Sequence, residues 1–243
     1  MEVFLNRIDG WDDAILTMFY SKRTVTREFE QHVRDVVYAA TNHDPSKGVV
    51  GELVYQTPEL ADWLEKLMKW TPKHITMGRF LDLSFTVYGI HRAGQDDLDA
   101  HAARMNNRII RSSTRLADFH GGEMSEYYDG KVIPTDVALA AVGVATPDEI
   151  EYEGQTYVKG VNGYILKGME NNKDVKRGLY MLSIPSDFIC KIDLTEFSHV
   201  YKERRIDGTA NPEVKTAVEK MVDHLESASL SWINRQLLMN IKN

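Results

Sequence analysis

The spacing of hydrophobic residues predicts three helices in the N-terminal third of the chain. Apolar residues recur at helical spacing over 11–21, 26–40 and 58–70. Thr26 is a suitable N-cap for the second segment, and Pro58 occupies the favoured first position of the third. This part of the protein is therefore expected to be helical.

Residues 80–90 (FLDLSFTVYGI) follow a different pattern, in which hydrophobic and polar residues alternate. Leu81, Leu83, Phe85 and Val87 fall on one side, which is typical of a half-buried strand. From Asp96 to Phe119 the chain has no glycine or proline and begins with acidic residues. The sequence therefore predicts a long helix here, beginning near Asp97.

The C-terminal half mixes both patterns. The predicted elements are a hairpin over 149–158 around Glu153-Gly154, a helix over 172–182, a strand over 188–192, a short helix over 194–202, and a last long helix from Asn211 to about Asn240. Together these elements predict an α+β fold that is mostly helical with a small central β-sheet. We expect a single domain spanning 1–243, with a hairpin insertion around 149–158.

Composition narrows the class of protein. The chain has 243 residues, of which 43% are hydrophobic, and a formal net charge of −7. It contains one cysteine, Cys190, and no apolar run long enough to span a bilayer. Because no signal-peptide pattern is present either, we expect a soluble cytoplasmic protein. The acidic charge argues against a general nucleic-acid coat but allows a local basic pocket.

One short stretch is strongly basic. In RMNNRIIRSSTR, residues 104–115, a helix would place Arg104, Arg108, Arg111 and Arg115 within roughly 60° of one another. His101 would lie one turn earlier on the same side, and no carboxylate interrupts the stretch. Three interpretations stay open: a face solvated or ion-paired to other elements, a phosphate pocket, and a nucleic-acid-binding helix.

Three segments in order resemble the flavin-dependent thymidylate synthases. The family's central signature closes in S-x-R, which matches Ser113 and Arg115, although Met105 and Asn106 replace a histidine and an arginine. RIDGTANPEV at 205–214 is similar to the stretch that opens the family's last long helix. VKRGLYMLSIPSDF at 175–188 resembles a helix and the strand that follows it.

The N-terminal half resembles the family more loosely, in the first helix at 11–21 and in LEKLMKWTPKHI at 64–75. In two places the chain carries a different residue. Asp187 stands where the family has an arginine that helps hold the nucleotide phosphate. Asp193 stands where the family has an asparagine that contacts the flavin.

The resemblance implies a reaction and a set of ligands. It implies methylation of a uracil nucleotide (dUMP to dTMP) at C5, with the methylene from methylenetetrahydrofolate and the hydride from reduced FAD. NADPH would reduce the flavin, and the sites would form between subunits of a homotetramer. Two other functions stay open: one-carbon transfer to another pyrimidine nucleotide, for example hydroxymethylation, and nucleotide or nucleic-acid binding without flavin catalysis.

The resemblance also implies roles for individual residues. Arg205 and Ser113 are the candidate catalytic residues. The candidate substrate-binding residues are His101, Arg111, Ser113, Arg115 and Arg205. The candidate cofactor-binding residues are His74, Arg104, Arg108, Asp193, His199 and Asn211. Their structural alternatives are a cap or an ion pair with Asp207 or Glu213 for Arg205, a helix end for Ser113 and an ordinary loop histidine for His74. No histidine cluster has metal-ligand spacing, so no metal is expected.

Overall fold

A computed structural model describes most of the chain. The residues outside the description are 23, 45–46, 100–107, 112–124, 173–174, 176–178, 180–181, 208–209, 230 and 242–243, and only the backbone is described at 108, 109 and 111. The chain divides into two compact units. The first comprises Met1–Val87, Asp97–Ile110 and Phe188–Asn243, and the second comprises Tyr88–Asp96 and Arg111–Asp187.

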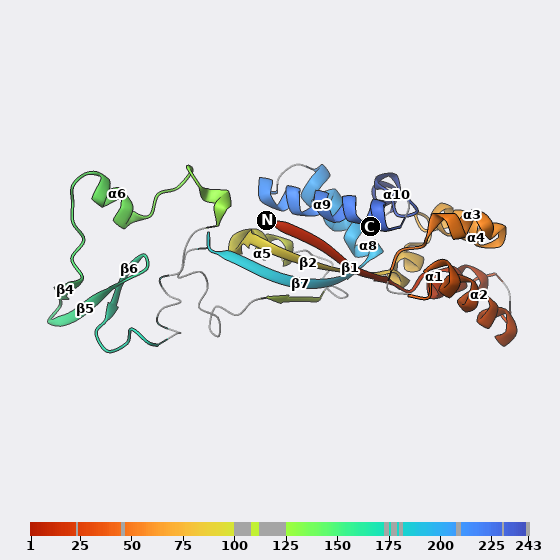
Figure 1. The fold of residues 1–243 in the computed structure, drawn as a ribbon, viewed down its shortest axis with the longest axis horizontal. Helices are drawn as coiled ribbons and strands as arrows, with labels where there is room; N and C mark the ends of the chain where they lie inside the picture. The colour runs from red at the N-terminus through yellow and green to blue at the C-terminus, as the bar shows by residue number, and fades with distance from the viewer. Residues whose placement is uncertain are drawn as a thin grey trace. The chain divides into compact units, whose positions relative to one another are not determined.

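A four-stranded sheet forms the framework of the first unit. Its strands are β1 (Glu2–Asp9), β2 (Asp82–His91), β7 (Pro185–Asp193) and β3 (Arg108–Arg111), in the order β1-β2-β7-β3 (Figure 1). The alternation predicted for β2 is confirmed, because Leu83, Phe85 and Val87 are all fully buried. The sequence analysis missed β1, in which the exposed Phe4 and a polar centre obscure the alternation.

Four helices pack together after β1. They are α1 (Trp11–Tyr20), α2 (Arg27–Ala40), α3 (Gly51–Gln56) and α4 (Pro58–Trp70). The Thr26 side chain accepts a hydrogen bond from the Phe29 amide, so the predicted N-cap of α2 is confirmed. Phe19, Phe29 and Trp63 join α1, α2 and α4 through edge-to-face contacts, with ring centroids 4.8 to 6.2 Å apart.

The C-terminal helices complete this unit. They are α8 (Leu194–Tyr201), a π-helical turn η5 (Lys202–Ile206), α9 (Pro212–Ala228) and α10 (Arg235–Asn240). Helix α9 packs on β1, and the Lys220 ammonium donates to the Met1 carbonyl at 2.9 Å. The prediction of one helix to Asn240 is wrong, because the helix ends at Ala228 and Ser231 adopts a positive φ of 70°.

The long helix predicted from Asp97 to Phe119 is also wrong where the chain is described. Helix α5 is described over Arg92–Asp99 and begins before the predicted Asp97, and Arg108–Arg111 forms the strand β3. The adjacent β-branched residues Ile109 and Ile110 favour extended backbone, and β7 offers β3 a ladder of hydrogen bonds. Tertiary pairing therefore overrides the helical spacing of the arginines.

The second unit contains a small sheet, β4 (Glu149–Tyr152), β5 (Gln155–Gly160) and β6 (Gly163–Leu166), together with α6 (Thr135–Ala141) and a short turn η4 (Glu126–Tyr128). Strands β4 and β5 form the predicted hairpin, with Tyr152 opposite Gln155. Glu153 and Gly154 have φ of 50° and 75°, which a tight two-residue turn requires. That this hairpin is an insertion into a single domain stays a prediction.

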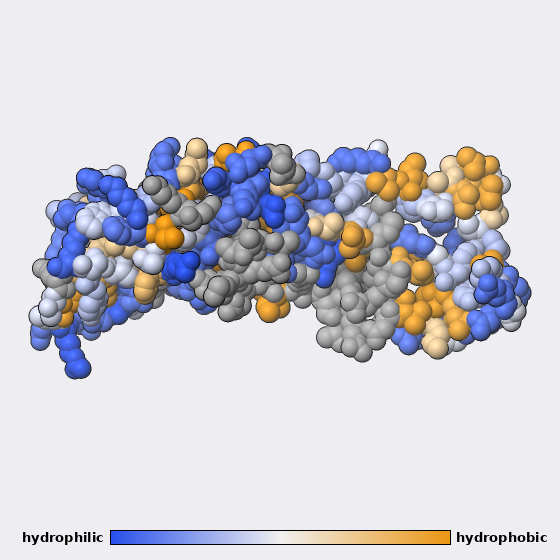
Figure 2. All heavy atoms as spheres, turned by 180° about the vertical axis from the view of Figure 1, so that it is seen from behind, coloured by the Kyte–Doolittle hydropathy of each residue, from blue (hydrophilic) through white to orange (hydrophobic). Residues whose placement is uncertain are grey.

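Hydrophobic side chains are frequent on the surface of the second unit. Figure 2 shows them gathered there more densely than on the visible face of the first unit. The exposed ones include Val132, Ile133, Val137, Val142, Val144 and Tyr152. The helix predicted over 172–182 lies largely outside the described residues. Among those described, Val175 is helical, whereas Leu179 and Leu182 are in turns.

Within the described part of the chain, no helix combines the length and apolar character needed to cross a membrane. The single cysteine lies in the middle of β7 and is buried. Burial raises the pKa of the Cys190 thiol to about 12. The thiolate is therefore suppressed at neutral pH, as is typical of a thiol buried in a core.

Candidate functional site

The described candidate residues of the C-terminal half lie in one stretch, where β7 ends and α8, the π-helical turn and α9 follow. Asp193, His199, Arg205 and Asn211 all belong to it. A short 3₁₀ helix, η1 (Ile75–Phe80), packs against α8 and brings the preceding His74 to the same part of the unit.

The contact between η1 and α8 is close and specific. The Thr195 hydroxyl donates to the Ile75 carbonyl at 2.7 Å, and the Leu194 amide donates to the Leu81 carbonyl at 2.9 Å. A Cβ at Gly78 would lie 2.6 Å from the Thr195 hydroxyl oxygen. The close approach therefore requires glycine at this position.

Two of the candidate cofactor residues are helix caps. The buried Asp193 carboxylate accepts a hydrogen bond from the Glu196 amide at 2.8 Å and caps α8. The Asn211 side chain accepts from the Glu213 amide at 2.9 Å and caps α9. Capping accounts for both residue types at these positions, because either side chain satisfies an otherwise unpaired helix amide.

Glu196, in the first turn of α8, was not identified from the sequence. Its side chain is buried, and its Oε2 has no hydrogen-bond partner among the described residues. Burial raises the pKa of this carboxyl and the neighbouring Asp193 raises it further, while Arg79 acts in the opposite direction. An acid in a first helical turn is usually exposed, so the sequence gives no signal of its burial.

The two candidate histidines differ in their surroundings. His74 is exposed and stacks on Trp70 with ring centroids 5.4 Å apart, and the Lys22 ammonium lies 3.3 Å above the Trp70 ring. His199 is largely buried, and its Nε2 lies 3.1 Å from the Glu203 carboxylate one turn later. His74 is thus the more accessible of the two to a ligand.

Two adjacent arginines, Arg204 and Arg205, project from the π-helical turn. Turns of this kind occur often at functional sites. Arg204 is mostly buried, with its Nη1 3.4 Å from an Asp97 carboxylate oxygen, and its Nε has no hydrogen-bond partner among the described residues. Arg205 is 42% exposed, and its Nε donates to the Glu219 carboxylate at 2.6 Å. Arg205 is therefore ion-paired, with Glu219, a partner that the sequence analysis did not name.

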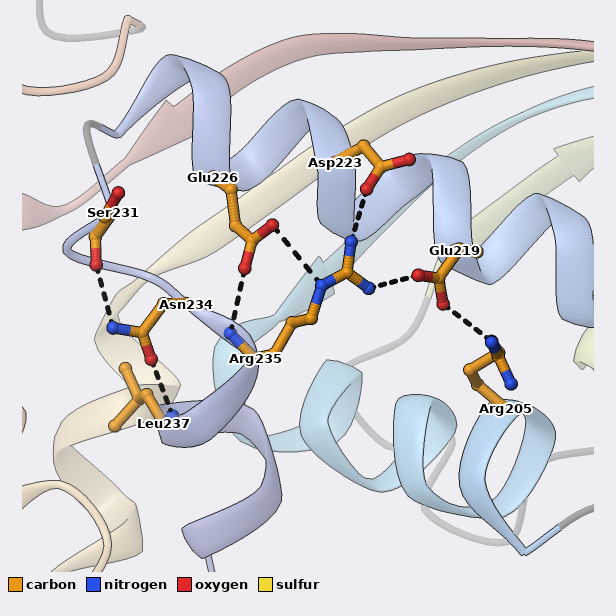
Figure 3. Close-up of polar contacts among 8 residues, drawn as sticks. All are labelled: Arg205, Glu219, Asp223, Glu226, Ser231, Asn234, Arg235 and Leu237. Carbon is orange, nitrogen blue, oxygen red and sulfur yellow. Dashed lines mark hydrogen bonds and ion pairs between the residues drawn. The ribbon is translucent and has the colours of Figure 1, made fainter.

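Glu219 belongs to an acidic face of α9. Glu219, Asp223 and Glu226 are spaced by four and three residues, so they share one side of the helix. Arg235 at the start of α10 contacts all three carboxylates, and Figure 3 shows Glu219 lying between Arg235 and Arg205. Burial acts to lower the pKa of Arg235, but a Tyr201 hydrogen bond and these carboxylates raise it overall.

The basic stretch cannot be assembled into the predicted helical face. Arg108 and Arg111 lie in β3, so the helical stacking of the four arginines is wrong at these two positions. The other candidates in this stretch, His101, Arg104, Ser113 and Arg115, lie outside the described residues. Their predicted roles stay predictions.

Asp187, in the place of the family's phosphate-binding arginine, has a structural role within the second unit. Its carboxylate accepts a hydrogen bond from the Gly89 amide at 2.8 Å. Gly89 has a positive φ of 74°, so the carboxylate fixes an irregular point of β2. A carboxylate in this position would repel a phosphate rather than bind it.

Neither a family model nor a curated protein matches this chain. Solved structures do. Thymidylate synthase X from Helicobacter pylori, solved with FAD and dUMP, is 11% identical over 98% of this chain and 100% of its own, with a TM-score of 0.51. The UMP/dUMP methylase PolB from Streptomyces cacaoi, solved with 5-Br dUMP, is 11% identical over 95% of this chain and 92% of its own, with a TM-score of 0.54. The similarity extends over nearly the whole of each chain and shows a shared fold.

Proposed function

We propose that this protein is an enzyme that methylates a uracil nucleotide at C5, converting dUMP to dTMP with methylenetetrahydrofolate and reduced FAD. One observation carries the proposal. The stretch 205–214, which resembles the family's C-terminal motif, opens the last long helix of a chain that shares its fold with two enzymes of uracil nucleotides. Fold alone does not fix chemistry, so the residues of this stretch are what the proposal depends on.

Arg205 is the residue we assign to the pyrimidine. Its exposed guanidinium would stabilise negative charge that develops on the ring as C5 becomes nucleophilic. The protein needs no cysteine nucleophile for this role, and the high pKa of the buried Cys190 thiol leaves it unsuited to be one.

The described residues fit an FAD in part. His74 is accessible beside Trp70, and the Arg204 Nε is a buried donor without a partner in the described part of the chain. Both groups suit a ligand that is flat, anionic and rich in acceptors. Bound FAD would supply the hydride, and NADPH would reduce it. Asp193 and Asn211 are less suited to direct contact, because each already caps a helix.

The identity of the nucleotide is the open part of the proposal. Asp187 replaces a phosphate-binding arginine, which favours a second candidate: the same one-carbon transfer to a different pyrimidine nucleotide, possessing either another base or another sugar. The product would then be a methylated or hydroxymethylated nucleotide. We further propose a homotetramer whose sites form between subunits, so that a partner chain supplies additional phosphate ligands.

The visible spectrum of the purified protein tests the flavin. We expect isoalloxazine absorption, or its appearance after incubation with FAD and gel filtration. A colourless protein that does not retain added FAD would overturn the flavin chemistry. Such a protein could still be a nucleotide-binding protein, which thermal stabilisation by dUMP, UMP, dCMP and CMP would reveal, since a ligand at 100 times its Kd adds about 2.7 kcal/mol.

The product identifies the reaction. In the presence of methylenetetrahydrofolate, NADPH and FAD, we expect the protein to convert dUMP to a compound 14 mass units heavier, as replacement of hydrogen by methyl requires. A product 30 mass units heavier would show hydroxymethylation instead. Turnover of UMP or a cytosine nucleotide in preference to dUMP would establish the second candidate.

A further inference from the structure

Glu219 is shared by two arginines that approach it from different elements. Its Oε2 accepts from the Nε of Arg205 in the π-helical turn, and its Oε1 is bound by the Nη1 of Arg235 in α10 (Figure 3). Each carboxylate oxygen thus has its own cationic donor. Such charge-assisted hydrogen bonds are the stronger ones in proteins.

The contact to Arg205 is made through only one part of the guanidinium. Its Nε is bound at 2.6 Å, whereas the structure records no hydrogen bond from its two Nη groups to the described residues. The Nη groups form the end of the planar donor fork that recognises carboxylate, phosphate and carbonyl oxygens. Glu219 therefore holds Arg205 while leaving its recognition end available to a ligand.

Glu219 is itself held firmly. It lies near the middle of the 17-residue helix α9, and Arg235 ties it to α10. Arg235 in turn contacts Asp223 and Glu226, and the Glu226 side chain also accepts from the Arg235 backbone amide at 3.2 Å. The position of the Glu219 carboxylate is thus set by two helices rather than by one flexible side chain.

We propose that Glu219 is a positioning residue that presents the Nη groups of Arg205 to the pyrimidine nucleotide. This inference rests on the proposed function. A free arginine side chain carries about 2 kcal/mol of rotamer entropy, part of which a ligand would otherwise have to overcome. Anchoring through the Nε restricts the side chain before the nucleotide binds, which favours both binding and the correct alignment of the charge.

The test is a double-mutant cycle on the full-length, FAD-loaded protein. The variants are Glu219→Gln, Arg205→Ala and the double variant, with Asp223→Asn as the matched control because Asp223 lies on the same face of α9 but contacts Arg235 instead of Arg205. Two quantities are measured for each: the Kd of dUMP by calorimetry and kcat. Thermal midpoints monitor folding. If Glu219→Gln does not yield folded protein, Glu219→Asp, which keeps the charge and shortens the side chain by one methylene, takes its place.

We expect Glu219→Gln to weaken dUMP binding and to lower kcat, each by roughly tenfold, as loss of a charged hydrogen bond implies. In the Arg205→Ala background the same change should have less than a twofold effect, because there is no longer an arginine to position. Asp223→Asn should stay within twofold of the parent in both backgrounds.

Three outcomes would overturn the inference. If the parent binds dUMP and the Glu219→Gln variant has the same affinity and turnover, the inference is overturned and the proposed function stays intact. Equal effects of Glu219→Gln on dUMP affinity and kcat with and without Arg205 would show that Glu219 does not act through Arg205. A parent that binds neither dUMP nor another pyrimidine nucleotide would overturn the proposed function and the inference together.

Discussion

Two arginines in the first unit are each surrounded by three carboxylates, but those carboxylates have different further partners. Arg34 in α2 contacts Asp12, Asp13 and Glu30. Arg235 in α10 contacts Glu219, Asp223 and Glu226. Each guanidinium is bound by three carboxylates and is about one third exposed, 37% for Arg34 and 33% for Arg235. The two centres form a natural comparison.

They differ in what else their carboxylates bind. At the Arg34 centre the additional contact is with the phenol of Tyr20, which donates to Glu30 at 3.2 Å. At the Arg235 centre it is Arg205, a second cation whose Nη groups make no hydrogen bond to the described residues. An arginine held by three acids has few N–H donors left for a ligand, whereas an arginine held by one acid has several. The number of carboxylates around a cation thus separates a structural arginine from a candidate binding residue.

The largest expected effect separates Arg205 from Arg34. We predict that Arg205→Ala lowers kcat at least 100-fold, because removing one preorganised charge from a transition state typically costs that much. Arg34→Ala should leave kcat within twofold, since that guanidinium is already occupied by its three carboxylates. Steady-state assays with dUMP measure both, and size-exclusion chromatography should show the parent's oligomer for each. Comparable losses in the two variants would mean that the comparison identifies no functional residue.

The next effect concerns stability. Arg235→Ala leaves three carboxylates close together on α9, and Arg34→Ala does the same for its three acids. We expect each variant to lose about 1–2 kcal/mol of unfolding free energy at low salt, a modest amount because both sites are partly exposed and screened. Urea unfolding at low and high sodium chloride measures this. For each variant, the loss of unfolding free energy should be smaller at high salt than at low salt. Even at high salt it should exceed the loss caused by an uncharged surface substitution. A loss independent of salt would contradict its electrostatic origin.

The comparison also shows what could be predicted from the sequence. Helices α1, α2 and α4 and strand β2 were predicted correctly, because their hydrophobic periodicity is strong and their caps are local. Strand β3 was not, since the spacing of its arginines is helical and only the neighbouring β7 makes it a strand. The sequence therefore predicts the elements whose own residues determine their structure, but not an element whose structure depends on a neighbouring strand.

The candidate site shows the same division. Arg205 was selected from the motif around it, and the structure places it in the expected stretch before α9. Its partner Glu219 could not be found, because the contact depends on a π-helical turn that brings α8 and α9 into contact. Glu196 was missed for a related reason, since its burial depends on packing rather than on its own helix.

Glu196 extends the comparison to an acid that makes no ion pair with an arginine of the described residues. Because burial raises its pKa above the ordinary value of 4.5, the folded protein holds this proton more tightly than the unfolded chain. Stability should therefore fall as pH rises from 4.5 through the folded pKa, and the penalty is complete above that pKa. Glu196→Gln removes the penalty, so the variant should gain stability relative to the parent between pH 4 and pH 8.

Chemical denaturation of both proteins across this pH range measures the difference. The paired acid Glu30 provides the control, because its pKa is lowered, chiefly by the hydrogen bond from Arg34. Glu30→Gln should show the opposite trend, with the parent gaining on the variant as pH rises. A Glu196→Gln variant whose stability differs from the parent by the same amount at every pH would refute the proposed burial effect.

The smallest effect should make the two centres indistinguishable. Asp13 and Asp223 are the most exposed carboxylates of their centres, at 50% and 58%. Replacing either by asparagine leaves its arginine with two carboxylates and exposes no buried charge, so each variant should lose less than about 0.5 kcal/mol. Both should retain parental kcat, because neither carboxylate contacts Arg205. If Asp223→Asn lowered kcat and Asp13→Asn did not, the whole Arg235 centre, and not only Glu219, would help to position Arg205. The difference between the Arg34 and Arg235 centres would then extend to every acid around the two arginines.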